Sequence, residues 1–422
     1  KIGTHVKQYF NQQTLFTAIT GASELCISPD AALPVLNLLI AKALSERVPV
    51  HLAIPQDILA AEINGNIAVP LPIPPHSEGK GFFSGDLEKA LTWMNEAQRP
   101  VFIIGRESRP YTTPLRSLAA GYGAGIVIGL DNKGGLPDTD PLVIGGVGPA
   151  NLPESWSEID LIISFGEAVY ERPYLPEGAR YIRLCDETSV LYDDGALLLN
   201  GDLETLINRL AEKSIVPGVR EAWRARIETT RRNNQIQLRE RSTPRDPVRF
   251  FRVLASLIRP DALITLDVGE FMHWFNWSFP AQTQTVLVSS NWRSMGCALA
   301  AAIAAKLHHT ERQVVAIIGD GGFLMSLGEL NTVIRLGLPL TVLVLRNGVY
   351  GLEMQKMAQM GFKPCGTELQ LPNIPQLASA CGWNSYQLND LNGCESILET
   401  AFQNPASLVD VNIDSQKLPY LK

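Results

Sequence analysis

The stretch "GDGGFLMSLGELNTVIRLGLPLTVLVLRN", residues 319–347, decides the fold of this chain. The apolar residues 314–319 predict a buried strand, residues 323–337 predict one helix, and residues 338–345 predict a second strand. Helical spacing places four apolar side chains on one buried stripe: Phe323, Leu327, Leu330 and Ile334. A strand, a helix and a strand in this order predict a right-handed unit with two parallel strands.

Asp320 and Asn347 stand at the two ends of this segment, and both are expected at the carboxyl ends of parallel strands, where such folds bind ligands. Gly319, Gly321 and Gly322 carry no side chain where the backbone turns into a helix, and exposed amides there attract phosphate. A carboxylate and an amide oxygen suit Mg²⁺, which bridges protein oxygens to phosphates. The segment therefore predicts a Mg²⁺–diphosphate site, against the alternative of a tight turn followed by an ordinary turn asparagine.

The chain as a whole alternates helix and strand patterns, which predicts an α/β protein with doubly wound parallel-sheet domains. Short buried strands are predicted at residues 100–105, 125–129, 161–166 and 181–185, and helices at 32–46, 86–97, 203–212 and 294–307. Residues 219–249 carry nine arginines against four acidic residues. This run predicts a solvated helix and hinge between domains or, alternatively, a basic contact surface for a partner.

The composition is that of an ordinary globular protein, with 422 residues, 45% hydrophobic residues and a formal net charge of −7. This mild charge gives no reason to expect nucleic acid binding, and no apolar run approaches the length of a membrane span. The six cysteines are scattered without a C-x-x-C pair, which favours buried free thiols over disulfides or a metal framework. We therefore expect a cytoplasmic protein without a signal peptide.

Residues 319–347 resemble the cofactor signature of thiamine diphosphate-dependent enzymes of the acetolactate synthase, pyruvate oxidase and 2-oxo acid decarboxylase superfamily. "VPVHLAIPQDI" (48–58) resembles the end of that family's pyrimidine-binding domain, and residues 84–212 resemble its middle domain. "LDVGEFMHWF" and "NWRSMGCALAAAIAAKL" resemble the beginning of its diphosphate-binding domain. "GLEMQKMAQMGFKPCGTEL" (351–369) is most similar to bacterial pyruvate oxidases and acetolactate synthases.

The resemblance implies a thiamine diphosphate-binding fold plus a Rossmann-like middle domain. The expected parts are 1–62, a C-terminal remnant of the pyrimidine-binding domain; 63–83, a linker; 84–215, the middle domain; 216–245, a basic helical linker; and 246–422, the diphosphate-binding domain. Because the chain begins at Lys1 with residues that read like mid-domain sequence, we expect on the order of a hundred residues before it. The family's catalytic glutamate belongs to that first domain, and the sequence contains no candidate for it.

Carried over residue by residue, the resemblance implies that Asp320, Asn347 and the main-chain carbonyl of Val349 bind Mg²⁺. Met295 matches the bulky apolar residue that props the cofactor into a bent conformation, so it counts as catalytic as well as cofactor-binding. The carbonyl of Arg293 would accept a hydrogen bond from the aminopyrimidine. The complete predicted cofactor-binding set is Gly269, Glu270, Arg293, Met295, Gly319, Asp320, Gly321, Gly322, Asn347, Val349 and Tyr350.

Three residues depart from the family pattern. Arg346 stands where the family usually has a first asparagine, and the sequence does not explain it. Glu270 stands near the expected diphosphate, where a carboxylate is unfavourable unless it turns away or pairs with a base. Glu353 stands six residues after Asn347, where simple decarboxylases carry a catalytic acid; the alternative is a residue of the first helical turn, where Glu is favourable anyway.

Flavin adenine dinucleotide (FAD) stays an alternative that the residues disfavour. Arg172 aligns with a flavin-contacting arginine of pyruvate oxidase and acetolactate synthase. However, Cys185 stands where those flavin binders tend to have Asp, with Asp186 one step away, and "GRESRP" (105–110) lacks their small-residue loop.

The first functional hypothesis is thiamine diphosphate- and Mg²⁺-dependent decarboxylation of a 2-oxo acid with carboligation to a second carbonyl, as in acetolactate synthases. The alternatives are a non-oxidative 2-oxo acid decarboxylase, a flavin-linked pyruvate oxidase-like enzyme, and a catalytically silent cofactor-binding relative. Since the family builds its active sites between subunits, a homodimer or homotetramer is expected. Trp274, Phe275 and Trp277 are interpreted as helix packing rather than as an acceptor pocket.

Overall fold

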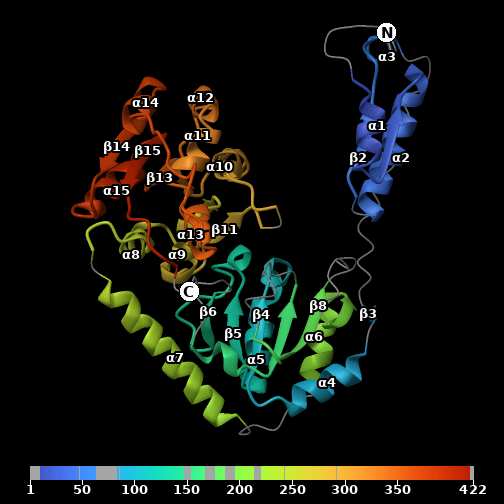
Figure 1. Ribbon diagram of the computed structural model, residues 1–422. Helices are drawn as coiled ribbons and strands as arrows, with labels where there is room; N and C mark the ends of the chain where they lie inside the picture. The colour runs from blue at the N-terminus through green and yellow to red at the C-terminus, as the bar shows by residue number, and fades with distance from the viewer. Residues whose placement is uncertain are drawn as a thin grey trace. The chain divides into compact units, whose positions relative to one another are not determined.

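The computed structural model describes residues 10–46, 48–62, 83–84, 86–146, 154–166, 176–185, 195–212, 220–241, 243–290 and 292–418. The chain divides into two compact units, residues 1–80 and 81–422 (Figure 1). The expected linker 63–83 lies, apart from Phe83, outside the described residues. Within the described ranges, every helix is too short or too polar to cross a membrane.

The first unit is a small α/β arrangement. It contains α1 (Gln12–Thr17), β1 (Ala22–Leu25), α2 (Ala32–Glu46), β2 (Val50–Ala53) and α3 (Gln56–Leu59). The two strands are parallel, and α2 has the bounds that its apolar spacing predicts. Among the described residues of this unit only Cys26 and Leu39 are buried, so the unit has very little core of its own.

The second unit begins with a seven-stranded sheet in the order β3-β9-β8-β7-β4-β5-β6. Its strands are β3 (Phe83–Ser84), β4 (Pro100–Ile104), β5 (Gly125–Ile128), β6 (Val143–Gly146), β7 (Leu161–Phe165), β8 (Arg180–Cys185) and β9 (Leu197–Gly201). Only β3 pairs antiparallel, with β9; the other six strands are parallel and have a Rossmann-like order. The Rossmann-like middle domain is therefore confirmed, and β6 and β9 are strands that the sequence analysis did not predict.

Helices cover both faces of this middle sheet. Alternate strand residues such as Phe102 and Ile104 pack against α4 (Leu87–Glu96), α5 (Thr112–Tyr122) and α6 (Leu203–Glu212). Val101 and Ile103 point the other way, into a cluster with Trp223 and Ile227 of α7 (Glu221–Glu240). The side-chain period of two along a strand thus buries both faces, which is why these strands read as continuous apolar runs.

Most of the arginine-rich run forms α7, the long yellow-green helix of Figure 1, and arginines in the first part of the run bind the middle domain. Arg220 is only 5% exposed, and its guanidinium donates to the carbonyls of Met94 (2.7 Å) and Ala97 (2.8 Å) and to that of Tyr122. These carbonyls end α4 and α5, where a positive charge is favourable. Arg226 pairs with Glu158 at 2.7 Å. These contacts favour the linker interpretation over a basic surface for a partner.

The last sheet has six parallel strands in the order β11-β10-β12-β13-β15-β14. They are β10 (Leu263–Leu266), β11 (Thr285–Val288), β12 (Val314–Gly319), β13 (Thr341–Arg346), β14 (Asn384–Leu388) and β15 (Ser407–Asn412). One face packs on α8 (Pro247–Leu257), α9 (Glu270–Ser278) and α15 (Cys394–Gln403), and the other on α10 (Cys297–His308), α12 (Glu329–Leu336) and α14 (Ile374–Ala380). The predicted α/β class with doubly wound parallel sheets is therefore confirmed.

The single helix predicted over residues 323–337 is wrong, because the structure has α11 (Asp320–Met325) and α12 with a break between them. Ser326 explains the break: its hydroxyl donates to the carbonyls of Gly322 (3.1 Å) and Phe323 (3.3 Å), and so competes with the helical ladder. The apolar stripe survives the break. Phe323 and Leu330 are fully buried in one cluster, and Leu327 and Ile334 pack against it.

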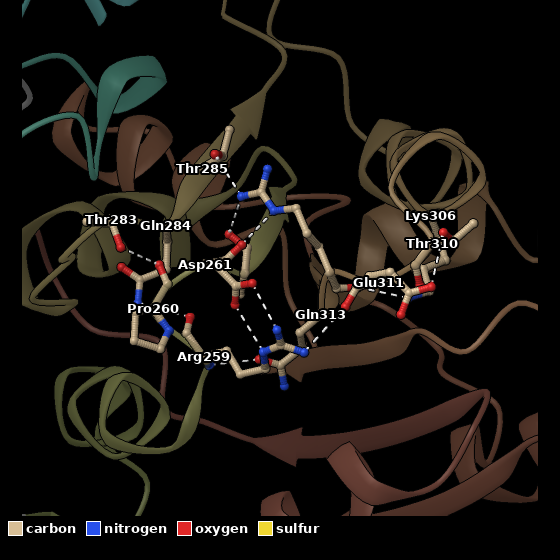
Figure 2. A network of polar contacts seen from close by, with 12 residues as sticks. Arg259, Pro260, Asp261, Thr283, Gln284, Thr285, Lys306, Thr310, Glu311 and Gln313 are labelled. Carbon is tan, nitrogen blue, oxygen red and sulfur yellow. Dashed lines mark hydrogen bonds and ion pairs between the residues drawn. The ribbon is translucent and has the colours of Figure 1, made fainter.

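The amino-terminal edge of this sheet carries a network of charges that pair with each other and with main-chain carbonyls (Figure 2). Arg259 binds both oxygens of Asp261, at 3.0 and 2.9 Å, and the Arg259 amide donates to Gln313 Oε1 at 2.8 Å. Lys306 donates to the carbonyl of Thr310 at 2.6 Å. The network joins the loops that enter β10, β11 and β12 at the amino-terminal edge of the sheet.

Candidate functional site

The carboxyl edge of the last sheet has a topological switch point between β10 and β12. From β10 the chain passes to β11 on one side, whereas β12 lies on the other side. In open α/β sheets the crevice at such a point is the usual ligand site. Asp267 and Gly269 follow β10 there, and Gly319 and Asp320 end and follow β12.

Asp320 brings the two ends of the segment 319–347 together. Its Oδ2 accepts hydrogen bonds from the amides of Asn347 (3.0 Å) and Gly348 (2.7 Å), and its Oδ1 accepts one from Gly321 (2.9 Å). The side chain is only 3% exposed. Burial raises the pKa of Asp320, while these three amides and Arg346 oppose the shift. The arrangement holds a carboxylate in a dry setting, where a cation gains most from it.

Asn347 folds its own side chain back onto the loop. Its Oδ1 accepts a hydrogen bond from the amide of Val349 at 3.1 Å, and Val349 also bridges to Glu368. Because an amide oxygen has two lone pairs, Asn347 can still offer one to a cation. Asp320 Oδ1 also keeps a lone pair, and the Val349 carbonyl belongs to the same loop. One carboxylate with neutral oxygens fits Mg²⁺, which takes its remaining ligands from phosphate and water.

The glycines of the site stand where a side chain would collide with a neighbour. A Cβ on Gly321 would lie 2.5 Å from the Tyr350 ring and 3.2 Å from Met295 Cε. A Cβ on Gly269 or Gly319 would lie 2.7 or 2.9 Å from the ring of Phe271. Met295, Gly321 and Tyr350 therefore meet at one place, and the main chain of Gly321 stays uncovered by a side chain of its own.

Arg293 has a left-handed backbone with φ of 55°, which is uncommon for a residue with a side chain. Its amide donates to the carbonyl of Ser289 at 3.2 Å, and the amide of Ser294 donates to the Ser289 hydroxyl at 3.1 Å. The turn is thus closed locally on both sides. Such strained residues cluster at functional sites, and the role of the Arg293 carbonyl stays a prediction.

Glu270 turns away from the main chain of Gly269 and binds the last part of the chain. Its Oε1 accepts from the amide of Gln416 (2.7 Å) and its Oε2 from the Ser415 hydroxyl (2.7 Å). Trp274 donates to the same carboxylate at 3.3 Å. The Glu270 carboxylate therefore turns away from the expected diphosphate instead of pairing with a base, and its partners are neutral donors. Burial raises the pKa of Glu270.

Glu353 lies in the first helical turn, the second of its two predicted settings, and Arg346 has a partner that the sequence did not reveal. The Glu353 side chain is 63% exposed in the first turn of α13 (Gly351–Gln359), 3.5 Å from Lys356, so it is not the partly buried carboxyl that an acid over the site requires. Arg346 pairs with Asp410 at 2.8 Å, and that carboxylate is only 2% exposed. The unexplained arginine therefore neutralises a buried acid of the neighbouring strand.

The aromatic residues of α9 pack as the sequence suggested. Trp274 and Phe275 are 1% and 0% exposed and belong to the core of the last domain. Trp277 is partly buried against the same core, and the guanidinium of Arg241 lies over it and over Trp274, at 5.8 and 4.8 Å. The packing interpretation therefore holds for Trp274 and Phe275, whereas Trp277 is only partly buried.

Asp267 is the residue that sequence reasoning missed. It is 0% exposed, and its carboxylate accepts hydrogen bonds from the amides of Gly296 (2.8 Å) and Cys297 (3.1 Å) at the beginning of α10. Burial raises its pKa, and the hydrogen bonds oppose the shift. The signal was available in "LDVG", where an acid and a glycine follow a strand much as they do in "IGDG".

The alternative of a bound flavin stays untested, and only some of the residues that bear on it are described. Arg172 and Asp186 lie outside the described residues. The Cys185 thiol is buried and donates to Asn200 Oδ1 at 2.9 Å. At the switch point between β4 and β7, the Glu107 carboxylate lies where a Cβ on Gly166 would come within 2.9 Å of it. An acid in that position is unfavourable for a dinucleotide phosphate.

His273 of α9 predicts a dependence of stability on pH. Burial lowers the pKa of its imidazole to about 4, and the charges of Arg293 and Lys356 act in the same direction. The unfolded chain takes up the proton near pH 6.5, so this contribution to stability is complete above pH 6.5 and is lost as pH falls towards 4. We expect a loss of about 2 kcal/mol in unfolding free energy, less than the full shift implies because the ring keeps some solvent contact.

The measurement is urea unfolding of the wild type and of His273→Gln at pH 7.5, 5.5 and 4.5. The raised pKa values of Asp267, Glu270 and Asp320 act oppositely in acid, but they are common to both proteins and cancel in the difference. The variant should lose about 2 kcal/mol less than the wild type between the first and last pH. Equal losses in the two proteins would contradict the burial of a neutral imidazole.

Comparison with known proteins gives two family matches. The thiamine pyrophosphate enzyme central domain matches residues 87–187, and the C-terminal thiamine pyrophosphate-binding domain matches residues 267–411. A Bacillus subtilis protein, provisionally described as thiamine pyrophosphate-containing, is 27% identical over 90% of this chain and 68% of its own length. A provisionally named 2-ketoarginine decarboxylase of Pseudomonas aeruginosa is 28% identical over 95% and 73%. The acetolactate synthase large subunit of Parasynechococcus marenigrum is 26% identical over 86% and 62%.

Proposed function

We propose that this chain, which contains the central and C-terminal domains of the thiamine pyrophosphate enzymes, binds thiamine diphosphate through Mg²⁺ at the switch point between β10 and β12. We propose further that it serves the decarboxylation of a 2-oxo acid with carboligation to a second carbonyl compound. The observation that carries the proposal is the contact of Asp320 with the amides of Asn347 and Gly348, which gathers the predicted metal ligands at one place.

The residues of the proposed site bind different parts of the metal–cofactor complex. Asp320, Asn347 and the Val349 carbonyl hold the metal ion, and the main chain at Gly269, Gly321 and Gly322 holds the diphosphate. Met295 and Tyr350 border the cofactor's central part, and the Arg293 carbonyl accepts a hydrogen bond from its aminopyrimidine. The bound cofactor would supply the stabilisation of the carbanion left when carbon dioxide departs. The chain's own part is to bind the cofactor, orient it and keep water from the reacting carbon.

A second candidate is non-oxidative decarboxylation. The 28% identity to a 2-ketoarginine decarboxylase over 95% of this chain favours it. In that case Glu353 would act as a general acid and donate a proton to the reacting carbon after decarboxylation. Because Glu353 is exposed in the described chain, this role needs another surface to cover it, which agrees with our proposal of a homodimer or homotetramer. A monomer by light scattering that retains full activity would contradict the proposed assembly.

The test is incubation of the full-length protein with thiamine diphosphate, Mg²⁺ and either pyruvate or a 2-oxo acid with a basic side chain. Carboligation predicts acyloin products such as acetolactate, whereas non-oxidative decarboxylation predicts aldehyde alone. Peroxide would instead indicate a flavin-linked oxidase. No turnover of any 2-oxo acid, with the cofactor bound, would indicate a silent relative.

A further inference from the structure

The main chain of Asp267 is held by the sheet, independently of the contacts that its side chain makes. It directly follows β10, and its own amide donates to the carbonyl of Ile317 in the neighbouring β12 at 2.9 Å. The side chain has no contact with solvent. The position of this carboxylate at the switch point is therefore fixed, and it can fix the position of the main-chain amides that donate to it.

The carboxylate caps α10 from outside the helix. Gly296 is the N-cap residue of this 12-residue helix, with φ of 80°, and it has no side chain to bind the free amides. Asp267 provides the missing acceptor, since Oδ2 binds the amide of Gly296 and Oδ1 that of Cys297. The Cys297 thiol lies 3.5 Å from the same oxygen. A negative charge at a helix N-terminus is favourable, so the cap is strong although it comes from a distant strand.

The same carboxylate also touches α11. A Cβ on Gly322 would overlap Asp267 Oδ2 and would lie 3.2 Å from the amide of Gly296. Glycine at position 322 is therefore required by Asp267 as well as by any ligand. The end of β10, the beginning of α10 and the first turn of α11 all meet at this one side chain.

Met295 precedes the capped residue directly and depends on the same anchor. Its Cε reaches within 3.2 Å of the position of a Cβ on Gly321, and the Tyr350 ring reaches the same position from another side. On its other side the chain passes through the left-handed turn at Arg293. A strained turn persists only when surrounding contacts stabilise it. The hydrogen bond from the Gly296 amide to Asp267 is the stabilising contact that directly follows Met295 in the sequence.

We propose that Asp267 is a positioning residue of the cofactor site, because it pins Gly296 and thereby sets the place of Met295 opposite Tyr350. The assignment rests on the proposed function, since Met295 matters only if it borders the cofactor. Asp267 itself acts through Gly296 and Met295 and does not have to touch the cofactor.

The experiment uses the full chain without cofactor, labelled with ¹³C at the methionine methyl groups and studied by nuclear magnetic resonance. The Met295 signal is assigned with Met295→Leu. In Asp267→Asn, which places an amide NH₂ against a donor, we expect the Met295 methyl resonance to shift and to sharpen as the side chain gains mobility. Hydrogen exchange of the amides at residues 294–298 should accelerate, while that of residues 341–346 should not.

Two matched pairs keep the test decisive. Gly322→Ala pushes on the Asp267 carboxylate without altering it and should shift the same methyl, whereas Gly328→Ala should not, because a Cβ there meets nothing within 4 Å. Thr265→Val is the control for a substitution in β10, because the Thr265 hydroxyl is buried without a hydrogen-bond partner. It should leave the Met295 methyl resonance unchanged. An unchanged Met295 methyl in a folded Asp267→Asn would overturn the proposal, as would an unchanged methyl in Gly322→Ala if Asp267→Asn does not fold.

Titration with thiamine diphosphate at saturating Mg²⁺ separates this proposal from the proposed function. In Asp267→Asn we expect the affinity to fall by about tenfold, the usual effect of losing a residue that orients a ligand-binding group. If the wild type binds no thiamine diphosphate, the proposed function fails, and the methyl and exchange results still decide whether Asp267 positions Met295. If the wild type binds and Asp267→Asn binds equally well, the positioning role is overturned and the proposed function stands.

Discussion

Replacing Asp320 by alanine weakens the binding of thiamine diphosphate in the presence of Mg²⁺ by at least about 100-fold, equivalent to roughly 3 kcal/mol. Asp320 is the one charged ligand in the proposed metal set, and it also holds the loop that carries Asn347. The variant therefore removes both the charge and the support for the second ligand. Isothermal titration calorimetry with the cofactor at fixed Mg²⁺ measures the loss.

Two further variants give this experiment its controls. Asp320→Asn keeps the size of the side chain and removes the charge, but it also places an NH₂ group against a main-chain amide that the carboxylate accepts from. It should bind about as weakly as the alanine variant, and the stability gained by losing a buried charge is offset by that lost hydrogen bond. Asp261→Ala removes an acid from the opposite edge of the same sheet, where the side chain is 52% exposed, and should leave binding unchanged. Wild-type affinity in Asp320→Ala would disprove the site.

Arg220→Met should lower the free energy of unfolding by about 3 kcal/mol, although the residue lies far along the chain from the proposed site. The substitution leaves three carbonyls at the ends of α4 and α5 without their buried donor. The stem of methionine fills part of the space, so the loss comes chiefly from the unsatisfied carbonyls. Urea unfolding followed by hydrogen exchange of residues 87–128 measures the effect on the middle domain itself.

The matched control is Arg232→Met in the same helix, at an exposed position. It should change the unfolding free energy by less than about 0.5 kcal/mol. Exchange in residues 263–346 should be affected less than exchange in the middle domain. Equal effects of the two substitutions would show that the carbonyl contacts of Arg220 contribute nothing to stability.

Strong local patterns predicted their elements well. The helix over 203–212 has the predicted bounds, because its apolar residues repeat at helical spacing, and the buried parallel strands appeared as apolar runs. The short strands β11 and β14 were missed, since each is an edge strand with only one buried residue, Val286 and Leu388 respectively. The break at Ser326 was missed because the choice of a hydroxyl between helix and turn is made in the folded structure.

In the candidate site, too, local sequence patterns predicted some residues, whereas tertiary contacts determine others. Asp320 and Asn347 could be paired from the sequence because one strand–helix–strand unit fixes where both of its ends lie. Asp267 could not be paired in this way, because its partners Gly296 and Cys297 begin α10, which follows β11 rather than the strand β10 that precedes Asp267. The direction of the Glu270 side chain could not be predicted either, because Ser415 and Gln416 join it only through tertiary folding.

The hydrogen bonds from Asn347 and Gly348 to Asp320 hold the loop through the chain's own atoms, and this has a consequence for the thermodynamics of binding. A loop that folds around its ligand buries surface as it orders and gives a large negative change in heat capacity. Because Asp320 fixes this loop, we expect the heat capacity change to come chiefly from the cofactor's own apolar surface. The rate of association should then be set by the departure of water from the metal ion rather than by a rearrangement of the chain.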